Sequence, residues 1–243
     1  MPARPRADRR PSASRTLGWL AAGLGTAGLL TGLVIAPPDA LQGNAARLMY
    51  LHVPAAWVAY LAFAVVFVAS AAHLRRQEPR FTAYARAAAE IGVVLTALTI
   101  AFGAVWGHLV WGTWWVWDPR LVSTAMLLVV YLGYLATRGL TGRDGATSRA
   151  ASFVGVAGFA LVPVVHFSVV WWRSVHQQAT LLAPSTNPPI DAVMAAALTL
   201  SVAAFTAGAA WLFLRRVTTL RATSAVSALP PTVPADAANG SPR

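Results

Sequence analysis

Residues 91–117 read IGVVLTALTIAFGAVWGHLVWGTWWVW, a run that contains no arginine, lysine, aspartate or glutamate. A transmembrane helix needs about 20 apolar residues, because each residue rises about 1.5 Å across a hydrocarbon core about 30 Å thick. This run is therefore too long for one span. It predicts a transmembrane helix at about 87–108, followed by a tryptophan-rich segment at 109–120 that lies outside the helix.

Five further apolar runs have lengths that fit membrane spans, and the whole chain is 57% hydrophobic and only 11% charged. A soluble domain has about 25% charged residues. The sequence therefore predicts an all-α integral membrane bundle of six transmembrane helices, occupying 17–215. The other five spans are expected at about 17–36, 53–72, 121–138, 150–172 and 192–214, with Pro163 producing a kink in the fifth. The tails at 1–16 and 216–243 are expected to be disordered.

The basic residues predict the orientation of this bundle. All 19 are arginines, and 16 of them fall in the two tails and in the loops after the second and fourth spans. Because cytoplasmic loops carry the excess of positive charge, both termini are expected in the cytoplasm. The first run is interpreted as a retained helix, since it is longer than the core of a usual signal peptide and lacks a clear cleavage site. Glu90 is expected near the inner end of its helix, close to Arg86.

Composition also excludes several classes of function. The sequence has no cysteine, which excludes disulfides, thiolate metal sites and haem held by cysteine. The net charge of +11 resembles a nucleic-acid signal, but the arginines are spread over tails and short loops. We therefore expect a membrane-lipid environment and no nucleic-acid partner.

The predicted outer face carries the segment WGTWWVWD, which has four tryptophans in seven positions. Tryptophan is common at the membrane–water interface, so an aromatic belt is one interpretation. This density exceeds what a belt needs. A second interpretation is a flat apolar platform on which a planar aromatic ligand stacks.

Two histidines are predicted at the same membrane depth as this platform. His52 lies at the outer start of the second span, and His176 lies just beyond the fifth. A lone histidine at a helix end is usually a hydrogen-bonded interface residue, but two from different helices can clamp one haem iron. The three outer arginines, Arg47, Arg120 and Arg173, either extend to the interface or pair with carboxylates such as those of haem.

The remaining histidines are weaker candidates. His108 lies at the outer end of the third span and is a possible neighbour of the platform. His166 lies inside the fifth span, where an ionisable residue is either functional or simply hydrogen-bonded. His73 lies at the inner end of the second span and is interpreted as interfacial.

The tryptophan segment resembles a known signature. Trp111, Gly112, Trp114, Trp115, Trp117 and Asp118 match, without departure, the pattern W-G-x-W-W-x-W-D of the haem-handling proteins of bacterial cytochrome c biogenesis. The segments MYLHVPAAW and HFSVVWWRSVHQ are similar to the histidine segments of the small six-helix member of the cytochrome c maturation system. The resemblance covers about 15–215.

The resemblance implies a haem-handling protein, not an enzyme, in the cytoplasmic (inner) membrane, with its haem site on the extracytoplasmic side. His52 and His176 would be the axial ligands of a non-covalent, b-type haem. The tryptophan segment, including Asp118, would contact haem and a membrane-anchored haem chaperone, and the outer arginines would pair with the haem propionates. A small single-span subunit and the subunits of an ABC transporter are the other implied partners.

Asp118 also has a local interpretation, as the cap of the fourth helix with Pro119 in the first turn. Gly112 is expected to allow close backbone approach among the crowded rings. For the whole protein, the alternative functions are a membrane electron carrier of the b-cytochrome type and a permease for haem. The histidines at the outer edge argue against the first, and the nearly uncharged spans argue against the second.

Overall fold

The computed structural model describes residues 13–140, 145–176 and 190–226, and all regular structure in these ranges is helical. Seven α-helices follow one another, two of them extended by short helical turns at Thr31–Ile35 and Asn44–Leu48. They are α1 (Ala13–Leu30), α2 (Met49–Arg76), α3 (Pro79–Trp111), α4 (Pro119–Leu140), α5 (Gly145–Gly158), α6 (Leu161–Trp171) and α7 (Ala192–Val226).

Six helical stretches of the described ranges are long and apolar enough to cross a bilayer. The predicted all-α bundle of six membrane-capable helices is thereby confirmed, with α5 and α6 together forming the fifth stretch. α3 continues to Trp111, so the first tryptophan of the motif is helical. α7 continues to Val226, past the tail boundary expected at 216, and the first tail gives way to helix from Ala13. The remaining tail residues, 1–12 and 227–243, lie outside the described ranges.

The break between α5 and α6 follows from Pro163. Proline has no N–H, so the carbonyl of Phe159 cannot receive the hydrogen bond that a helix would supply four residues later. That carbonyl instead accepts the N–H of Val162, at 3.0 Å. The chain turns at residues 159–160, and α6 leaves at a new angle. The predicted kink therefore lies one turn before the proline.

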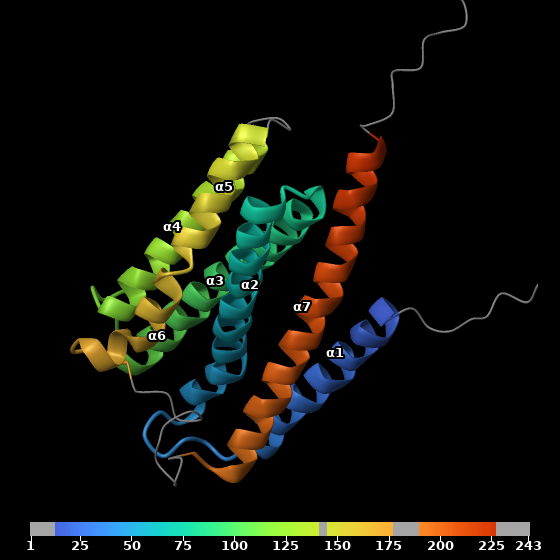
Figure 1. Cartoon of the computed structure of the whole chain (residues 1–243). Helices are drawn as coiled ribbons and strands as arrows, with labels where there is room; N and C mark the ends of the chain where they lie inside the picture. The colour runs from blue at the N-terminus through green and yellow to red at the C-terminus, as the bar shows by residue number, and fades with distance from the viewer. Residues whose placement is uncertain (1–12, 141–144, 177–189, 227–243) are drawn as a thin grey trace, which may run out of the picture.

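The helices form three groups (Figure 1). α1 lies along α7, α2 and α3 form an antiparallel pair in the centre, and α4 lies beside α5 and α6. Phe63 of α2 stacks on Tyr131 of α4 with ring centroids 3.8 Å apart. Gly92 of α3 makes this possible, because a Cβ there would come within 2.6 Å of the Phe63 ring. Large apolar side chains such as Trp19 and Val129 are exposed on the outside, as expected of helices that face lipid.

Successive spans alternate in direction, so the connections at 36–48, 112–118 and 172–176 gather at one end of the bundle, which we call the loop end (Figure 1). Toward the opposite end, Glu90 of α3 accepts hydrogen bonds from Arg86, at 3.1 Å, and from Arg216 of α7, at 2.5 and 2.9 Å. The expected proximity of Arg86 and Glu90 is present. The Glu90 carboxylate also links α3 to α7 through Arg216.

Replacing Glu90 by glutamine is expected to lower the free energy of unfolding by about 1–2 kcal/mol, because the two arginines lose their shared carboxylate in a partly exposed setting. Thermal unfolding of the full chain in detergent measures this loss. Glu78→Gln is the matched control, since Glu78 pairs with Arg80 but both side chains are 40% or more exposed. Equal losses in the two variants would contradict the prediction.

Candidate functional site

A cavity of about 500 Å³ lies between α2, α3, α4 and α6 toward the loop end. Its volume falls within the range of about 300–1,000 Å³ that is usual for small-molecule sites. Aromatic and aliphatic side chains make up most of its wall. The polar side chains that reach it include His52, His166, His176 and Arg120. Of the sequence-predicted residues, the fold therefore brings together both proposed ligands and one of the three outer arginines.

His52 extends into the cavity from the first turn of α2. Its Nδ1 lies 3.0 Å from the backbone carbonyl oxygen of Thr99 in α3. A carbonyl only accepts, so Nδ1 carries the proton in this contact. Nε2 then keeps its lone pair, which is the form of imidazole that binds a metal.

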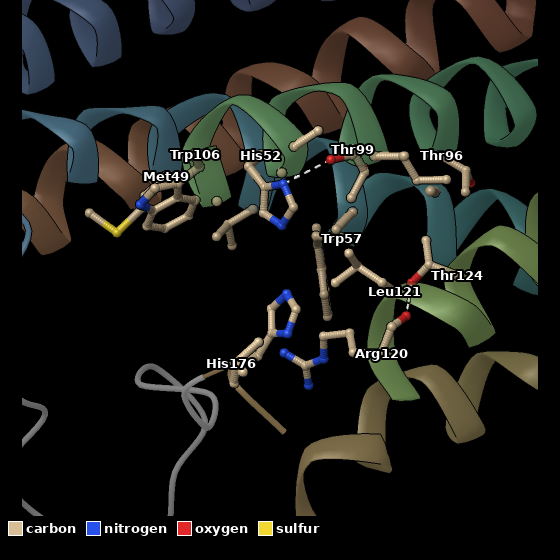
Figure 2. A pocket seen from close by; sticks show the side chains of 18 of the residues that line it. Met49, His52, Trp57, Thr96, Thr99, Trp106, Arg120, Leu121, Thr124 and His176 are labelled. Atoms are coloured by element: carbon tan, nitrogen blue, oxygen red, sulfur yellow. Dashed lines mark hydrogen bonds between the residues drawn. The ribbon is translucent and has the colours of Figure 1, made fainter. Parts of the chain in front are cut away.

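His176 enters the cavity from the extended segment after α6. Its Nδ1 lies 3.2 Å from Oδ1 of Asp118. A carboxylate beside one ring nitrogen fixes the tautomer and leaves the other nitrogen free to bind. Figure 2 shows the rings of His52 and His176 pointing toward one another across the cavity. Two imidazoles from different elements, each with Nδ1 occupied, thus face the same space.

Asp118 is buried and connects three parts of the loop end. It accepts the N–H of Arg120 at 2.8 Å, which confirms its predicted capping of α4. It also accepts the N–H of Val175 at 2.9 Å and lies beside His176. The sequence did not reveal these last two contacts, because they join residues more than 50 positions apart.

The surroundings of Asp118 and His176 set their charge. Burial by itself would raise the pKa of Asp118, but hydrogen bonds from Ser174, Val175 and Arg120 and the nearby His176 hold it below its usual value. Burial lowers the pKa of His176, and the positive charge of Arg120 acts in the same direction, while Asp118 opposes both. At neutral pH the pair is therefore a carboxylate and a neutral imidazole.

The four tryptophans of the motif divide into two sets. Trp111 and Trp115 line the cavity, and Trp111 meets the His176 ring edge-on with centroids 5.2 Å apart. Trp114 stacks on His108 at 4.1 Å, and Trp117 is 86% exposed. Gly112 ends α3 with a positive φ of 73°, a conformation that glycine adopts without strain. The expected single platform is thus divided into an inner pair, Trp111 and Trp115, which lines the cavity, and an outer pair, Trp114 and Trp117, which is exposed.

The three outer arginines have different surroundings. The Arg120 guanidinium lies beside His176 in the cavity (Figure 2). One of its terminal nitrogens donates to the carbonyl of His166 at 3.0 Å, while its buried Nε has no partner in the described ranges. Arg47 instead donates to the carbonyls of Gly32 and Ala36, at 2.7 and 3.2 Å. Arg173 is exposed.

The weaker histidine candidates also separate. His166 lines the cavity, where its ring meets Tyr60 edge-on with centroids 6.4 Å apart. His108 is exposed and is occupied by its contact with Trp114. His73 is buried at the far end of α2 and bonds Ser148 of α5 at 3.0 Å. Among the three, only His166 therefore shares the cavity.

Sequence reasoning did not single out Trp57 and Tyr60, which also line the cavity from α2. A signal was present, because His52, Ala56 and Tyr60 follow one another at intervals of four and share one face of the helix. The face that carries the best candidate histidine also supplies the cavity wall.

In the ligand-free protein we expect His176 to protonate below pH 6.5, because burial lowers its pKa from that value. Between the folded pKa and 6.5, the unfolded chain binds more protons, so the free energy of unfolding rises with pH and its gain is complete above 6.5. Nitrogen NMR of the imidazole in detergent measures the midpoint. Asp118→Asn should lower it further, since Asp118 raises this pKa. A midpoint at or above 6.5 would contradict the prediction.

Comparison with known proteins confirms the resemblance seen in the sequence. The profile of the family described as "Heme exporter protein C" matches residues 8–229. The chain is 37% identical over 172 residues to Heme exporter protein C of Bradyrhizobium diazoefficiens, covering 70% of this chain and 65% of that one. It is 38% identical over 163 residues to Heme exporter protein C of Escherichia coli K12, covering 67% and 66%. A Marchantia polymorpha relative named as a cytochrome c biosynthesis ccmC-like mitochondrial protein is 36% identical over 147 residues, covering 60% and 62%. The chain thus spans just under two thirds of the length of these relatives.

Proposed function

This chain belongs to the Heme exporter protein C family, and on that premise we propose that it holds haem between His52 and His176 and delivers it for cytochrome c maturation. The observation that carries the proposal is the pair of imidazoles that face one cavity from α2 and from the segment after α6. Each has its Nδ1 occupied by an acceptor, so each presents Nε2 to the same space.

The donor set fits haem better than a bare metal ion. A bare ion bound by protein alone needs three or four ligands, and no group of three or more metal-binding side chains occurs in the described ranges. Haem brings four ring nitrogens of its own and leaves two axial positions for histidine. The apolar wall suits the porphyrin faces, and Trp111 and Trp115 offer flat surfaces beside them.

Arg120 fits a haem propionate. Its guanidinium lies beside His176, and its buried Nε lacks a partner in the described ranges, as expected of a donor that awaits an anionic ligand. We therefore propose Arg120 as the propionate-binding arginine and do not propose Arg47, whose donors are engaged. We propose that the haem is bound non-covalently, which agrees with the lack of any cysteine to form a thioether bond.

Delivery needs a surface that a partner can reach beside the cavity. Trp114 and Trp117 are exposed at the loop end, next to the cavity-lining Trp111 and Trp115. We propose that this outer pair contacts a membrane-anchored haem chaperone, with a small single-span subunit and ABC transporter subunits as further partners. We propose that the loop end lies on the extracytoplasmic side of the inner membrane, an orientation that the arginine distribution favours. We propose that the protein positions and transfers haem, which is a handling role and not an enzymatic one.

The test is purification of the tagged full chain from membranes that contain the maturation system, followed by detection of haem in each co-purified protein. We expect a small protein that keeps its haem under denaturing conditions. Replacing Trp114 and Trp117 by alanine should remove this protein and leave the haem of the purified chain in place. Trp19→Ala is the matched control, because Trp19 is exposed on α1, away from the motif.

Two outcomes would overturn the proposal. Absence of haem from the purified wild-type chain would reject the haem site. Undiminished recovery of the haem-loaded partner with the Trp114/Trp117 double variant would reject the delivery surface while leaving the haem site intact.

A further inference from the structure

We propose that Gly103 of α3 is a positioning residue for His52: its missing side chain opens the Thr99 carbonyl to the imidazole and thereby fixes the tautomer that presents Nε2. The contact between His52 and Thr99 follows from the fold alone. The part of the inference that concerns iron rests on the proposed function.

The His52 ring lies close to Gly103. A Cβ at this position would lie 3.0 Å from Cε1 and 3.3 Å from Nδ1 of His52. Contacts between carbon atoms are optimal at about 3.5–4.0 Å. The imidazole thus occupies the volume that any other residue at this position would fill, and an alanine would push the ring away.

The Thr99 carbonyl oxygen accepts the hydrogen bond from His52, and its place in the helix explains why residue 103 matters. In an α-helix, the carbonyl of residue 99 points toward residue 103, and each Cα–Cβ bond leans back toward the helix N-terminus. A side chain at 103 would therefore lean over the Thr99 carbonyl oxygen. That oxygen has two lone pairs, one for the helical N–H of Gly103 and one for a second donor. Glycine leaves the second lone pair open, and His52 Nδ1 occupies it at 3.0 Å.

The His52 ring has a second neighbour on α3. Trp106, one turn beyond Gly103, meets His52 edge-on with ring centroids 5.7 Å apart. The indole N–H of Trp106 donates to Oε1 of Gln42 at 2.8 Å, which holds the indole in place. Gly103 and Trp106 of α3 thus both contact the imidazole and limit the positions that its ring can take.

The cost of glycine supports a specific role. Glycine inside a helix is less favourable than alanine by about 0.5–1 kcal/mol. Along α3, Gly92 makes room for Phe63, and Gly107 makes room for Trp111. Gly103 follows the same pattern, but the ring that it accommodates faces the cavity and carries a candidate ligand nitrogen.

The test is Gly103→Ala in the full-length protein, with Gly133→Ala as the matched control. Gly133 also lies within a membrane-capable helix, and a Cβ there would meet no atom within 4 Å. In the haem-free protein, nitrogen NMR should show His52 protonated at Nδ1 in the wild type and in Gly133→Ala. Gly103→Ala should give a mixture of tautomers, because displacement of the ring by a few tenths of an ångström weakens its bond to Thr99.

In the haem-loaded protein, Gly103→Ala should weaken haem binding by about 10–100-fold, the usual effect of losing a partner that orients a metal ligand. Electron paramagnetic resonance should also show a high-spin fraction that is absent in the control. A second variant guards against a simple folding defect. In the His52→Ala background the displaced ring is gone, so adding Gly103→Ala should cause no further loss of affinity.

The outcomes separate the two proposals. A wild-type chain without bound haem would reject the proposed function, while the tautomer measurement would still test Gly103. If the wild type binds haem through His52 but Gly103→Ala leaves tautomer and affinity unchanged, the positioning role is wrong. It is equally wrong if Gly103→Ala weakens binding as much in the His52→Ala background as in the wild type.

Discussion

Replacing His176 by alanine is expected to weaken haem binding by at least about 100-fold and to convert a six-coordinate, low-spin iron to a five-coordinate, high-spin one. Loss of a residue that only orients a metal ligand lowers metal affinity by about 10–100-fold. Loss of the ligand itself should therefore lower the affinity by at least about 100-fold. His52→Ala should have the same effect from the other side of the cavity. Optical titration of the purified full chain with haem measures both the affinity and the spin state.

Rescue by free imidazole distinguishes a lost ligand from a lost structural contact. In His176→Gly, the space of the ring remains, and added imidazole should restore the low-spin spectrum. His108→Ala is the control, because His108 is exposed and stacks on Trp114. Unchanged affinity and spectrum in both His52→Ala and His176→Ala would show that the iron is held elsewhere in the protein.

The fold was predictable because a bilayer imposes one length on every span. Runs of about 20 apolar residues gave the number and order of the helices, and the structure confirms both. The helix ends were less predictable, because hydrophobicity ends where the hydrocarbon ends, whereas a helix ends where its backbone is capped. α7 continues through Arg215 and Arg216 to Val226 for this reason. Gly112 was the true end signal for α3, since its positive φ allows the turn.

The outer segments were expected to share one site. One cavity agrees with this expectation, since its lining includes His52, His176, Trp111, Trp115 and Arg120, whose functional roles we propose above. That expectation needed only sequence position and membrane depth. The different roles of the outer arginines could not be predicted from the sequence, because they depend on individual hydrogen bonds. Arg47 turns to the carbonyls of Gly32 and Ala36, which the end of the first span leaves free. No local pattern in the sequence distinguishes it from Arg120, whose Nε stays unpartnered in the described ranges.

The division of the tryptophan motif has the same cause. Four rings within seven residues look equivalent in the sequence, yet a turn at Gly112 places the rings that follow it on different sides. Trp115 lines the cavity. Trp117 is exposed, and its ring meets the Trp115 ring edge-on with the two ring centroids 6.0 Å apart. Sequence reasoning can give the presence of such a cluster. Only the backbone path decides which ring lines the cavity and which is exposed.

Replacing Arg120 by glutamine is expected to weaken haem binding by about 10–100-fold. A hydrogen bond to a charged group contributes about 1.5–3 kcal/mol, and each 1.4 kcal/mol is a factor of ten. Arg173→Gln is the matched control and should change little, because Arg173 is exposed. Arg120→Lys should fall between the two, since lysine keeps the charge but loses the planar pair of donors.

A second ligand isolates the carboxylate contact from any damage to the protein. Haem dimethyl ester has the same iron and the same ring but no propionate charge. The wild type should bind it about 10–100-fold more weakly than haem, whereas Arg120→Gln should bind the two ligands with similar affinity. The Arg120 side chain also donates to the carbonyl of His166, and losing that bond weakens both ligands equally, so it cancels in the comparison. If Arg120→Gln still prefers haem to its ester by the wild-type factor, another cation binds the propionates.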